Sequence, residues 1–265
     1  MDLELSGKTA IVTGGSRGIC KAIAREFGRE GIDVALVSRG REALEATARE
    51  LAQETGRKMI PIQADTGNEE SIQAMVQQAV SELGHLDILV NSAARVGGGA
   101  APSLSEITAE YFWEDMNVKV LGYLRCAQEV APHMIKQGWG RIINISGLAA
   151  RQSGSVVGSI RNVSVAAMSK NMADELGPHG INVTVVHPGL TRTERTADIV
   201  DERASREAIS TGEAEERMAQ GISIRRMIDA KEIAYVVTFL ASPKSVAING
   251  DAVAVAGGSG RAIHY

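Results

Sequence analysis

A glycine-rich turn near the start of the chain constrains the fold more than any other feature. Residues 13–20 read Thr-Gly-Gly-Ser-Arg-Gly-Ile-Cys and follow an apolar run, 9–12, that is typical of a buried strand. A helical pattern then begins, with apolar residues at Ile19, Ile23 and Phe27. A strand, a glycine turn and a helix start in this order form a cradle for a phosphate group, because glycine lets the backbone approach a pyrophosphate and the helix N-terminus offers free N–H groups. The alternative interpretation is an ordinary strand-to-helix turn.

Short apolar runs alternate with amphipathic stretches along the rest of the chain. This alternation predicts an α/β fold, a doubly wound Rossmann-type parallel sheet of seven strands with helices on both faces, in a single domain over residues 1–265. Beyond the first strand and helix, we expect strands at 33–37, 58–62, 86–90, 141–145, 181–186 and 252–255, and helices at 42–54, 69–83, 108–136, 157–176 and 230–241.

The segment 191–223 breaks this rhythm. It is long, charged and poor in strand-forming residues. Long insertions in compact domains are usually lids or binding loops. We therefore predict a mobile substrate lid here.

Composition excludes several classes of function. The net charge is −4 with no basic run, so a nucleic-acid partner is not expected, and no apolar run reaches the length of a membrane span. The first residues do not resemble a signal peptide. Cys20 and Cys126 fit neither a disulfide framework nor a metal site. We expect a cytoplasmic protein that acts on a small molecule and uses no metal.

The residues at the strand ends favour NADP(H) over NAD(H). The second strand ends at Ser38-Arg39, where an acidic residue would bind the ribose hydroxyls of NAD. A guanidinium suits a 2′-phosphate instead, and Arg17 in the glycine turn adds a second positive charge. The alternative is that both arginines are simply solvated. Asp65-Thr66 ends the third strand and could hold the adenine, and the small residues of 91–94 would let a cofactor lie against the backbone.

Together these residues resemble the short-chain dehydrogenase/reductase family over essentially the whole chain. The turn at 13–18 is similar to the family's TGxxxGxG motif, and 91–94 (Asn-Ser-Ala-Ala) to its NNAG motif. The resemblance implies that Asn117 is the active-site asparagine and that Thr193, after Pro188-Gly189, holds the nicotinamide carboxamide. The cofactor-binding residues expected on both grounds are Gly14, Ser16, Arg17, Gly18, Ile19, Ser38, Arg39, Asp65, Thr66, Asn91, Ala93, Ala94, Ile145, Pro188, Gly189 and Thr193.

The chain departs from the family at the catalytic positions. The family uses a serine, a tyrosine and a lysine four residues after the tyrosine, and no tyrosine here is followed by a lysine at that spacing. Alignment from the helix end at 173–181 puts Gly158 at the tyrosine position and Asn162 at the lysine position, and Gly147 takes the place of the serine. Cys20 also replaces the third glycine of the turn, which predicts a slight displacement of the helix with binding retained.

The replacements must be sought nearby. Arg161 shares a helix face with Gly158 and could stabilise a developing oxyanion, or it could lie at the solvent or at a subunit contact. Asn162 could hold a ribose hydroxyl, and Ser146 could donate a hydrogen bond or simply bind backbone. His187 is a weaker candidate acid. The expected catalytic set is therefore Asn117, Ser146, Arg161 and Asn162.

These inferences predict an NADP(H)-dependent short-chain oxidoreductase with a non-standard active site, acting on a small carbonyl, enone or alcohol. A positioned general acid is worth roughly 10²–10⁴ in rate, so loss of the tyrosine should weaken the inherited mechanism while cofactor binding survives. Two alternatives stay open, namely a catalytically silent NADP(H)-binding subunit or sensor, and a non-redox lyase or isomerase on the same fold. The resemblance also implies a homo-oligomer, a dimer or a tetramer.

Overall fold

Seven parallel strands form the main sheet of the computed structural model, which describes residues 1–94 and 101–260. The strand order is β3-β2-β1-β4-β5-β6-β9, so the predicted doubly wound sheet is confirmed. The order reverses between β1 and β4, and ligands of such sheets bind at that point, beyond the carboxyl ends of the strands. The strands are β1 (Thr9–Thr13), β2 (Asp33–Ser38), β3 (Met59–Gln63), β4 (Ile88–Asn91), β5 (Gly140–Ile145), β6 (Ile181–Pro188) and β9 (Ala252–Val255).

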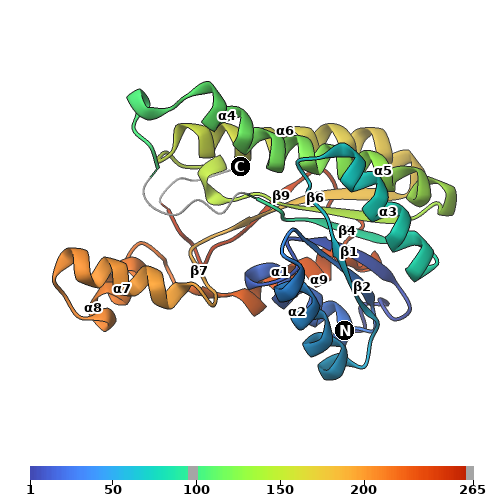
Figure 1. Ribbon diagram of the computed structural model, residues 1–265, viewed down its shortest axis with the longest axis horizontal. Helices are drawn as coiled ribbons and strands as arrows, with labels where there is room; N and C mark the ends of the chain where they lie inside the picture. Colours follow the sequence, from blue (N-terminus) through green and yellow to red (C-terminus); the bar gives the residue numbers. More distant parts are fainter. Residues whose placement is uncertain (95–100, 261–265) are drawn as a thin grey trace.

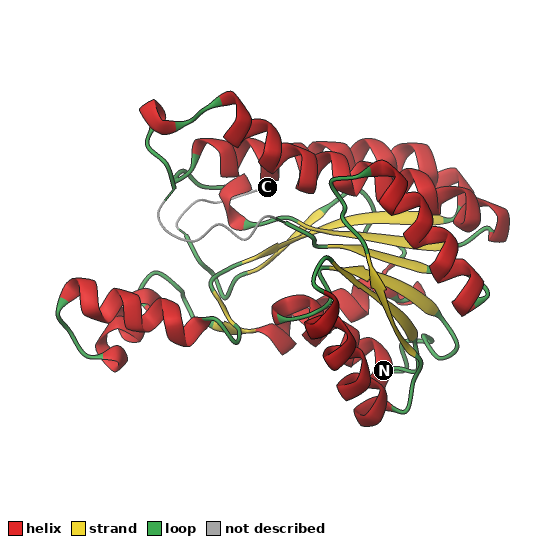
Figure 2. Ribbon diagram, in the orientation of Figure 1, coloured by secondary structure: helices red, strands yellow, loops and turns green. Residues whose placement is uncertain are grey.

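Helices cover both faces of this sheet (Figures 1 and 2). On one side lie α1 (Gly18–Arg29), α2 (Arg41–Thr55) and α9 (Ala230–Ala241), and on the other lie α3 (Glu69–Leu83), α4 (Ala109–Met116), α5 (Gly122–Gln137) and α6 (Val156–Leu176). Successive side chains of a strand point to opposite faces, so Val12 and Leu36 belong to the first apolar layer, and Ile11 and Val37 to the second. Short 3₁₀ turns are η1 (Leu104–Glu106), η3 (Leu148–Ala150), η4 (Gly177–His179) and η5 (Pro243–Ser245).

The long helix expected at 108–136 contains an irregular turn. Residues Asn117–Leu121 form a π-helical segment, η2, between α4 and α5. A π-turn inserts an extra residue and changes which side chains face inward, and such turns are frequent at functional sites. This one lies beside the ends of the central strands, and it decides which residues of the helix reach the site.

The segment predicted as a lid is largely helical. It contains α7 (Thr196–Glu207) and α8 (Thr211–Ala219), which pack on each other through a small apolar cluster of their own. A two-stranded sheet of β7 (Thr191–Arg192) and β8 (Ile228–Asp229) joins the pair to the body, and Figure 1 shows both helices projecting away from the main sheet. None of the helices in the described part of the chain has the length and apolar character needed to cross a membrane.

Candidate active site

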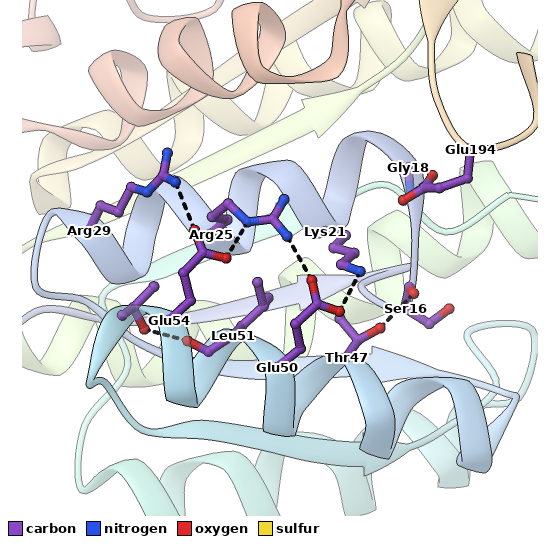
Figure 3. A network of polar contacts seen from close by, with 11 residues as sticks. Ser16, Gly18, Lys21, Arg25, Arg29, Thr47, Glu50, Leu51, Glu54 and Glu194 are labelled. Atoms are coloured by element: carbon purple, nitrogen blue, oxygen red, sulfur yellow. Dashed lines mark hydrogen bonds and ion pairs between the residues drawn. The ribbon is translucent and has the colours of Figure 1, made fainter.

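The glycine turn is pinned over the end of β2. The N–H groups of Gly14 and Gly15 both donate to the carbonyl of Val37, at 2.7 and 3.0 Å. Gly14 has φ +77°, and a Cβ on Gly15 would lie 2.8 Å from a methyl carbon of Leu36, so both positions favour glycine. The Thr47 hydroxyl on α2 donates to the carbonyl of Ser16 at 2.9 Å (Figure 3). The turn is therefore held as a preformed backbone cradle.

An anionic group already lies at the start of α1. The Gly18 N–H donates to a carboxylate oxygen of Glu194 at 2.9 Å (Figure 3). Arg17, the N-cap residue, has no side-chain cap, so this carboxylate partners one of the free N–H groups that a helix N-terminus leaves. Glu194 comes from the segment after β6, next to Thr193, and the contact shows that this helix end accepts negative charge.

A cavity of about 450 Å³ opens beside the turn. Ser38 and Arg39 lie in its wall with Arg17, and no acidic residue follows β2 at 38–40. This charge pattern and the backbone cradle fit a dinucleotide with a 2′-phosphate. The predicted cofactor residues that line the cavity are Gly14, Ser16, Arg17, Ser38, Arg39, Asp65, Thr66, Ala93 and Ala94.

The other predicted cofactor residues lie at the ends of β4, β5 and β6, at the start of α1 and after β7. Asn91 is fully buried; its amide donates to Asn144 at 3.0 Å, and its side-chain oxygen has no hydrogen-bond partner among the described residues. Gly18 and Thr193 border a second hollow together with Glu194. Ile19 lies in the first turn of α1, Ile145 and Pro188 end β5 and β6, and Gly189 follows β6; these four are not among the residues that line the cavity.

Ser146, Gly147 and Asn162 come together at the end of β5. The Ser146 hydroxyl donates to the backbone carbonyl of Asn162 at 3.0 Å. Its proton is therefore used on backbone, which was the alternative interpretation of this serine. A Cβ added to Gly147 would lie 3.0 Å from the Asn162 amide nitrogen. The buried Asn162 side-chain oxygen has no partner in the structure and remains available to accept a hydrogen bond.

Arg161 is paired rather than free. One guanidinium nitrogen lies 2.8 Å from each carboxylate oxygen of Asp115 on α4. Both side chains are largely shielded, with exposures of 21% and 9%. The predicted role as an oxyanion-stabilising charge is therefore corrected in one respect, because Asp115 compensates that charge. Arg161 does share a face with Gly158, whose added Cβ would lie 4.0 Å from the guanidinium.

Asn117 does not join this cluster. Its amide donates to the Gly67 carbonyl at 3.0 Å, and its side-chain oxygen accepts from Arg125 at 2.8 Å. Both partners lie toward the loop after β3. The catalytic role of Asn117 stays a prediction, and the π-turn directs another residue inward two positions later.

That residue is Lys119, which the sequence reasoning missed. It is 5% exposed, and its ammonium donates to the backbone carbonyl of Ser146 at 2.9 Å. Burial, helped by the nearby Arg161 charge, lowers the pKa of Lys119 to about 7, although Asp115 and Cys20 oppose the change. Within residues 1–94 and 101–260, no carboxylate lies within ion-pair distance of this ammonium.

The described tyrosines are either hydrogen-bonded within the core or exposed on the surface. The buried Tyr123 hydroxyl donates to the Ile145 carbonyl at 3.0 Å, and burial raises its pKa well above the usual value. Tyr111 and Tyr235 are exposed on α4 and α9. The His187 ring nitrogen Nδ1 accepts a 3.4 Å hydrogen bond from the Gly147 N–H, which positions the loop at Gly147.

The sheet, the cradle and the basic cavity define a dinucleotide-binding α/β protein. Comparisons with known proteins are consistent with this class. The family described as enoyl-(acyl carrier protein) reductase matches residues 14–259. An NADPH-dependent reductase, BacG of Bacillus subtilis, is 30% identical over 98% of this chain and 100% of its own length. A putative ketoacyl reductase of Streptomyces coelicolor is 34% identical over 96% of this chain and 97% of its own length. The structure of L-sorbose reductase from Gluconobacter frateurii, complexed with NADPH and L-sorbose, has a TM-score of 0.92 at 28% identity, covering 98% of both chains.

The chain belongs to the short-chain dehydrogenase/reductase family. The predicted class, an NADP(H)-dependent oxidoreductase with a Rossmann-type sheet, is confirmed at the level of this family. The described residues contain no group of histidine, cysteine and acidic side chains that could hold a metal ion.

Proposed function

We propose that this protein reduces a small carbonyl or enone compound with NADPH through an active site that lacks the family's serine, tyrosine and lysine. The observation that carries the proposal is the meeting of Ser146, Gly147 and Asn162 at the end of β5, with Gly158 one helical turn before Asn162 on α6. A Cβ added at Gly147 would lie 3.0 Å from the Asn162 amide nitrogen, which supports placing positions 147 and 162 in one site. The similarity to NADPH-dependent and ketoacyl reductases supports a carbonyl substrate.

NADPH would supply the hydride when bound. Arg17, Ser38 and Arg39 would hold its 2′-phosphate, and Asp65 with Thr66 its adenine end. The unpartnered Asn162 side-chain oxygen would accept from a ribose hydroxyl, a role that needs no charge. Thr193 would hold the carboxamide, as the family resemblance implies.

The residues at the tyrosine and serine positions cannot donate a proton from a side chain. The nearby Tyr123 hydroxyl is committed to the Ile145 carbonyl. A ketone whose alkoxide needs a proton should therefore react slowly, whereas a substrate whose reduced product is a delocalised anion should be less affected.

The test is a panel of plain ketones and quinones given to wild type, Arg161→Ala and the triple variant Gly147→Ser/Gly158→Tyr/Asn162→Lys. The triple variant restores the family's residues and should accelerate plain ketones by up to 10²–10⁴-fold. Wild-type reduction of plain ketones at about 10 s⁻¹, the usual rate for an enzyme, would overturn the proposal. Because a Cβ at position 158 would lie 2.8 Å from the Ser155 hydroxyl, a folding control by circular dichroism accompanies the variant.

The Arg161–Asp115 pair favours a second candidate, a catalytically silent NADP(H)-binding subunit. A guanidinium neutralised by its own chain is less useful for substrate charge. Calorimetry that shows NADPH binding, together with no oxidation of NADPH across the whole panel, would favour this candidate over the first.

We also infer a homo-oligomer that acts in the reduced cytoplasm. Both Cys20 and Cys126 are free and buried, and burial raises the pKa of their thiols to about 11 and about 12, which keeps them protonated. The apolar side chains of Val156, Ile160 and Val163 are exposed along α6, as expected of a helix that packs on another copy.

A further inference from the structure

Lys119 is a buried titratable group that the function proposed above does not use. It lies on the π-turn between α4 and α5, and its ammonium donates to the carbonyl of Ser146, the residue before Gly147. Ser146 in turn donates to Asn162. The amine is thus connected directly to the strand end where the family's catalytic side chains are missing.

Charged and titratable groups face Lys119 from every helix packed around it. Asp115 approaches from α4, Arg161 from α6, Cys20 from α1 and the Tyr123 ring, 6.0 Å away, from α5. The Cys20 thiol and the Tyr123 phenol remain neutral, because burial raises their pKa values. The Arg161–Asp115 ion pair cancels its own charge. Lys119 is therefore the net positive charge of this cluster.

An ammonium in such a position opposes folding. Removing a charged group from water costs several kcal/mol unless a paired charge and hydrogen bonds compensate, and here one backbone carbonyl is its hydrogen-bond partner. A methionine would fill the same space without that penalty. Groups of this kind, with a pKa moved toward neutrality, cluster at active sites, where a proton must be held and released near working pH.

The Lys119 amine lies at the end of β5, one residue along the π-turn from the wall of the cofactor cavity. The Lys119 ammonium carries three protons and uses one on the Ser146 carbonyl, so others remain to be given. Its sequence neighbour Val118 lines the cofactor cavity. The amine is therefore a proton source held at the end of β5 by the Ser146 carbonyl, close in sequence to the cavity wall.

We propose, resting on the function proposed above, that Lys119 is the proton donor of this active site. As the carbonyl carbon of the substrate gains a hydride, the carbonyl oxygen takes a proton from Nζ, so an alcohol forms and the lysine becomes a neutral amine. Bound NADPH would supply the hydride and leave as NADP⁺, and the amine would regain its proton from solvent. One hydride and one proton are thus added to the carbonyl compound.

The first test measures the ionisation of Lys119 without turnover. NMR of protein with isotope-labelled lysine gives the pKa of each amine, and the Lys119→Met spectrum identifies its signal. The amine should titrate near pH 7, and NADP⁺ should lower its pKa relative to NADPH by about 1, because the oxidised ring is positively charged. An ordinary lysine pKa, or one that is the same in both complexes, would overturn the proposal.

The second test is the pH profile of reduction of cyclohexanone and phenanthrenequinone. Wild-type rates should fall as the ammonium is lost above about pH 7, whereas Lys119→Arg should lack this fall. Lys119→Met should lose about 10²-fold on cyclohexanone, the low end for a general acid because the buried amine replaces the tyrosine only in part, and less on the quinone, whose reduced product tolerates a negative charge. The exposed Lys170→Met is the matched control and should leave both rates unchanged.

Two further variants separate a proton donor from a structural lysine. Asp115→Asn removes a carboxylate that favours the ammonium, so the midpoint of the profile should move to lower pH; Arg161→Met removes a repelling charge and should move it to higher pH. If both variants turn over with the same midpoint of the pH profile as wild type, the role of Lys119 is refuted, whereas the proposed function is not. Failure to bind NADPH in calorimetry would instead refute the proposed function.

Discussion

A single buried lysine has consequences for stability as well as for chemistry. Since burial lowers the pKa of Lys119 in the folded chain to about 7, the unfolded chain binds more protons between about pH 7 and the ordinary lysine pKa near 10.4. Stability should therefore rise with pH over this window and lose that contribution as the pH falls toward 7.

Lys119→Met should remove this pH dependence and stabilise the protein at neutral pH by about 1–4 kcal/mol, as replacement of a buried charge by an apolar group often does. Urea denaturation from pH 6 to pH 10 measures the effect, with Lys170→Met as the exposed control. Equal slopes in wild type and Lys119→Met would show that the amine is ionised in the folded state as it is in water.

Arg39 should determine which dinucleotide binds. NADPH should bind more tightly than NADH, and Arg39→Ala should lose about 1–3 kcal/mol of NADPH affinity, the value of a charged hydrogen bond, with little change for NADH. Arg41, an exposed arginine paired with Glu45 outside the cavity wall, provides the control Arg41→Ala. Calorimetric titration that gives equal affinities for both cofactors would contradict the assignment.

At the scale of elements, the helical stretch 109–137 contains a π-turn that a regular helical pattern in the sequence does not predict. The family resemblance implies that Asn117 faces the site, provided that the helix is regular. The π-turn instead turns Lys119 toward the end of β5. One signal was present in the sequence. Lys119 lies four residues before Tyr123 and seven before Cys126, so it falls on the buried phase of that helix. A charged residue on the buried, apolar face of a helix is a candidate for a functional role.

The segment 191–223 should behave as a lid. Its helices α7 and α8 bury a small cluster of their own and project from the sheet, so few contacts hold them to the body. Hydrogen exchange should be fast here in the free protein and slower with NADPH and a substrate bound. Uniformly slow exchange without ligand would show that the pair is a fixed part of the structure.

At the scale of the whole molecule, exposed apolar residues favour association. Val156, Ile160 and Val163 recur at helical spacing on the outer side of α6. Ile160→Asp should therefore shift the protein to a smaller species in light scattering coupled to gel filtration. Ile199→Asp, a change at an equally exposed isoleucine on α7, is the control and should have no effect. A monomeric wild type would exclude this interface.

Most of the fold was predictable because each strand and helix carries its own local pattern. The apolar runs predicted all seven strands of the sheet, and the final strand at 252–255 agrees residue for residue. The phosphate cradle also followed from local sequence. The pairing of Arg161 with Asp115, 46 residues apart, and the inward turn of Lys119 depend on packing between helices, which periodicity alone does not encode.

The carboxylate of Glu194 at the start of α1 has a further consequence for the exchange of ligands. The Gly18 amide that it occupies belongs to the helix end where a pyrophosphate is expected, so an incoming dinucleotide must displace it, and a departing one leaves the helix end to be satisfied again from within the chain. We expect this carboxylate to assist departure of the spent cofactor as an internal replacement anion. We expect Glu194→Gln to slow dissociation of NADP⁺ in stopped-flow measurements, which would make the segment after β6 a determinant of how quickly the protein can begin another cycle.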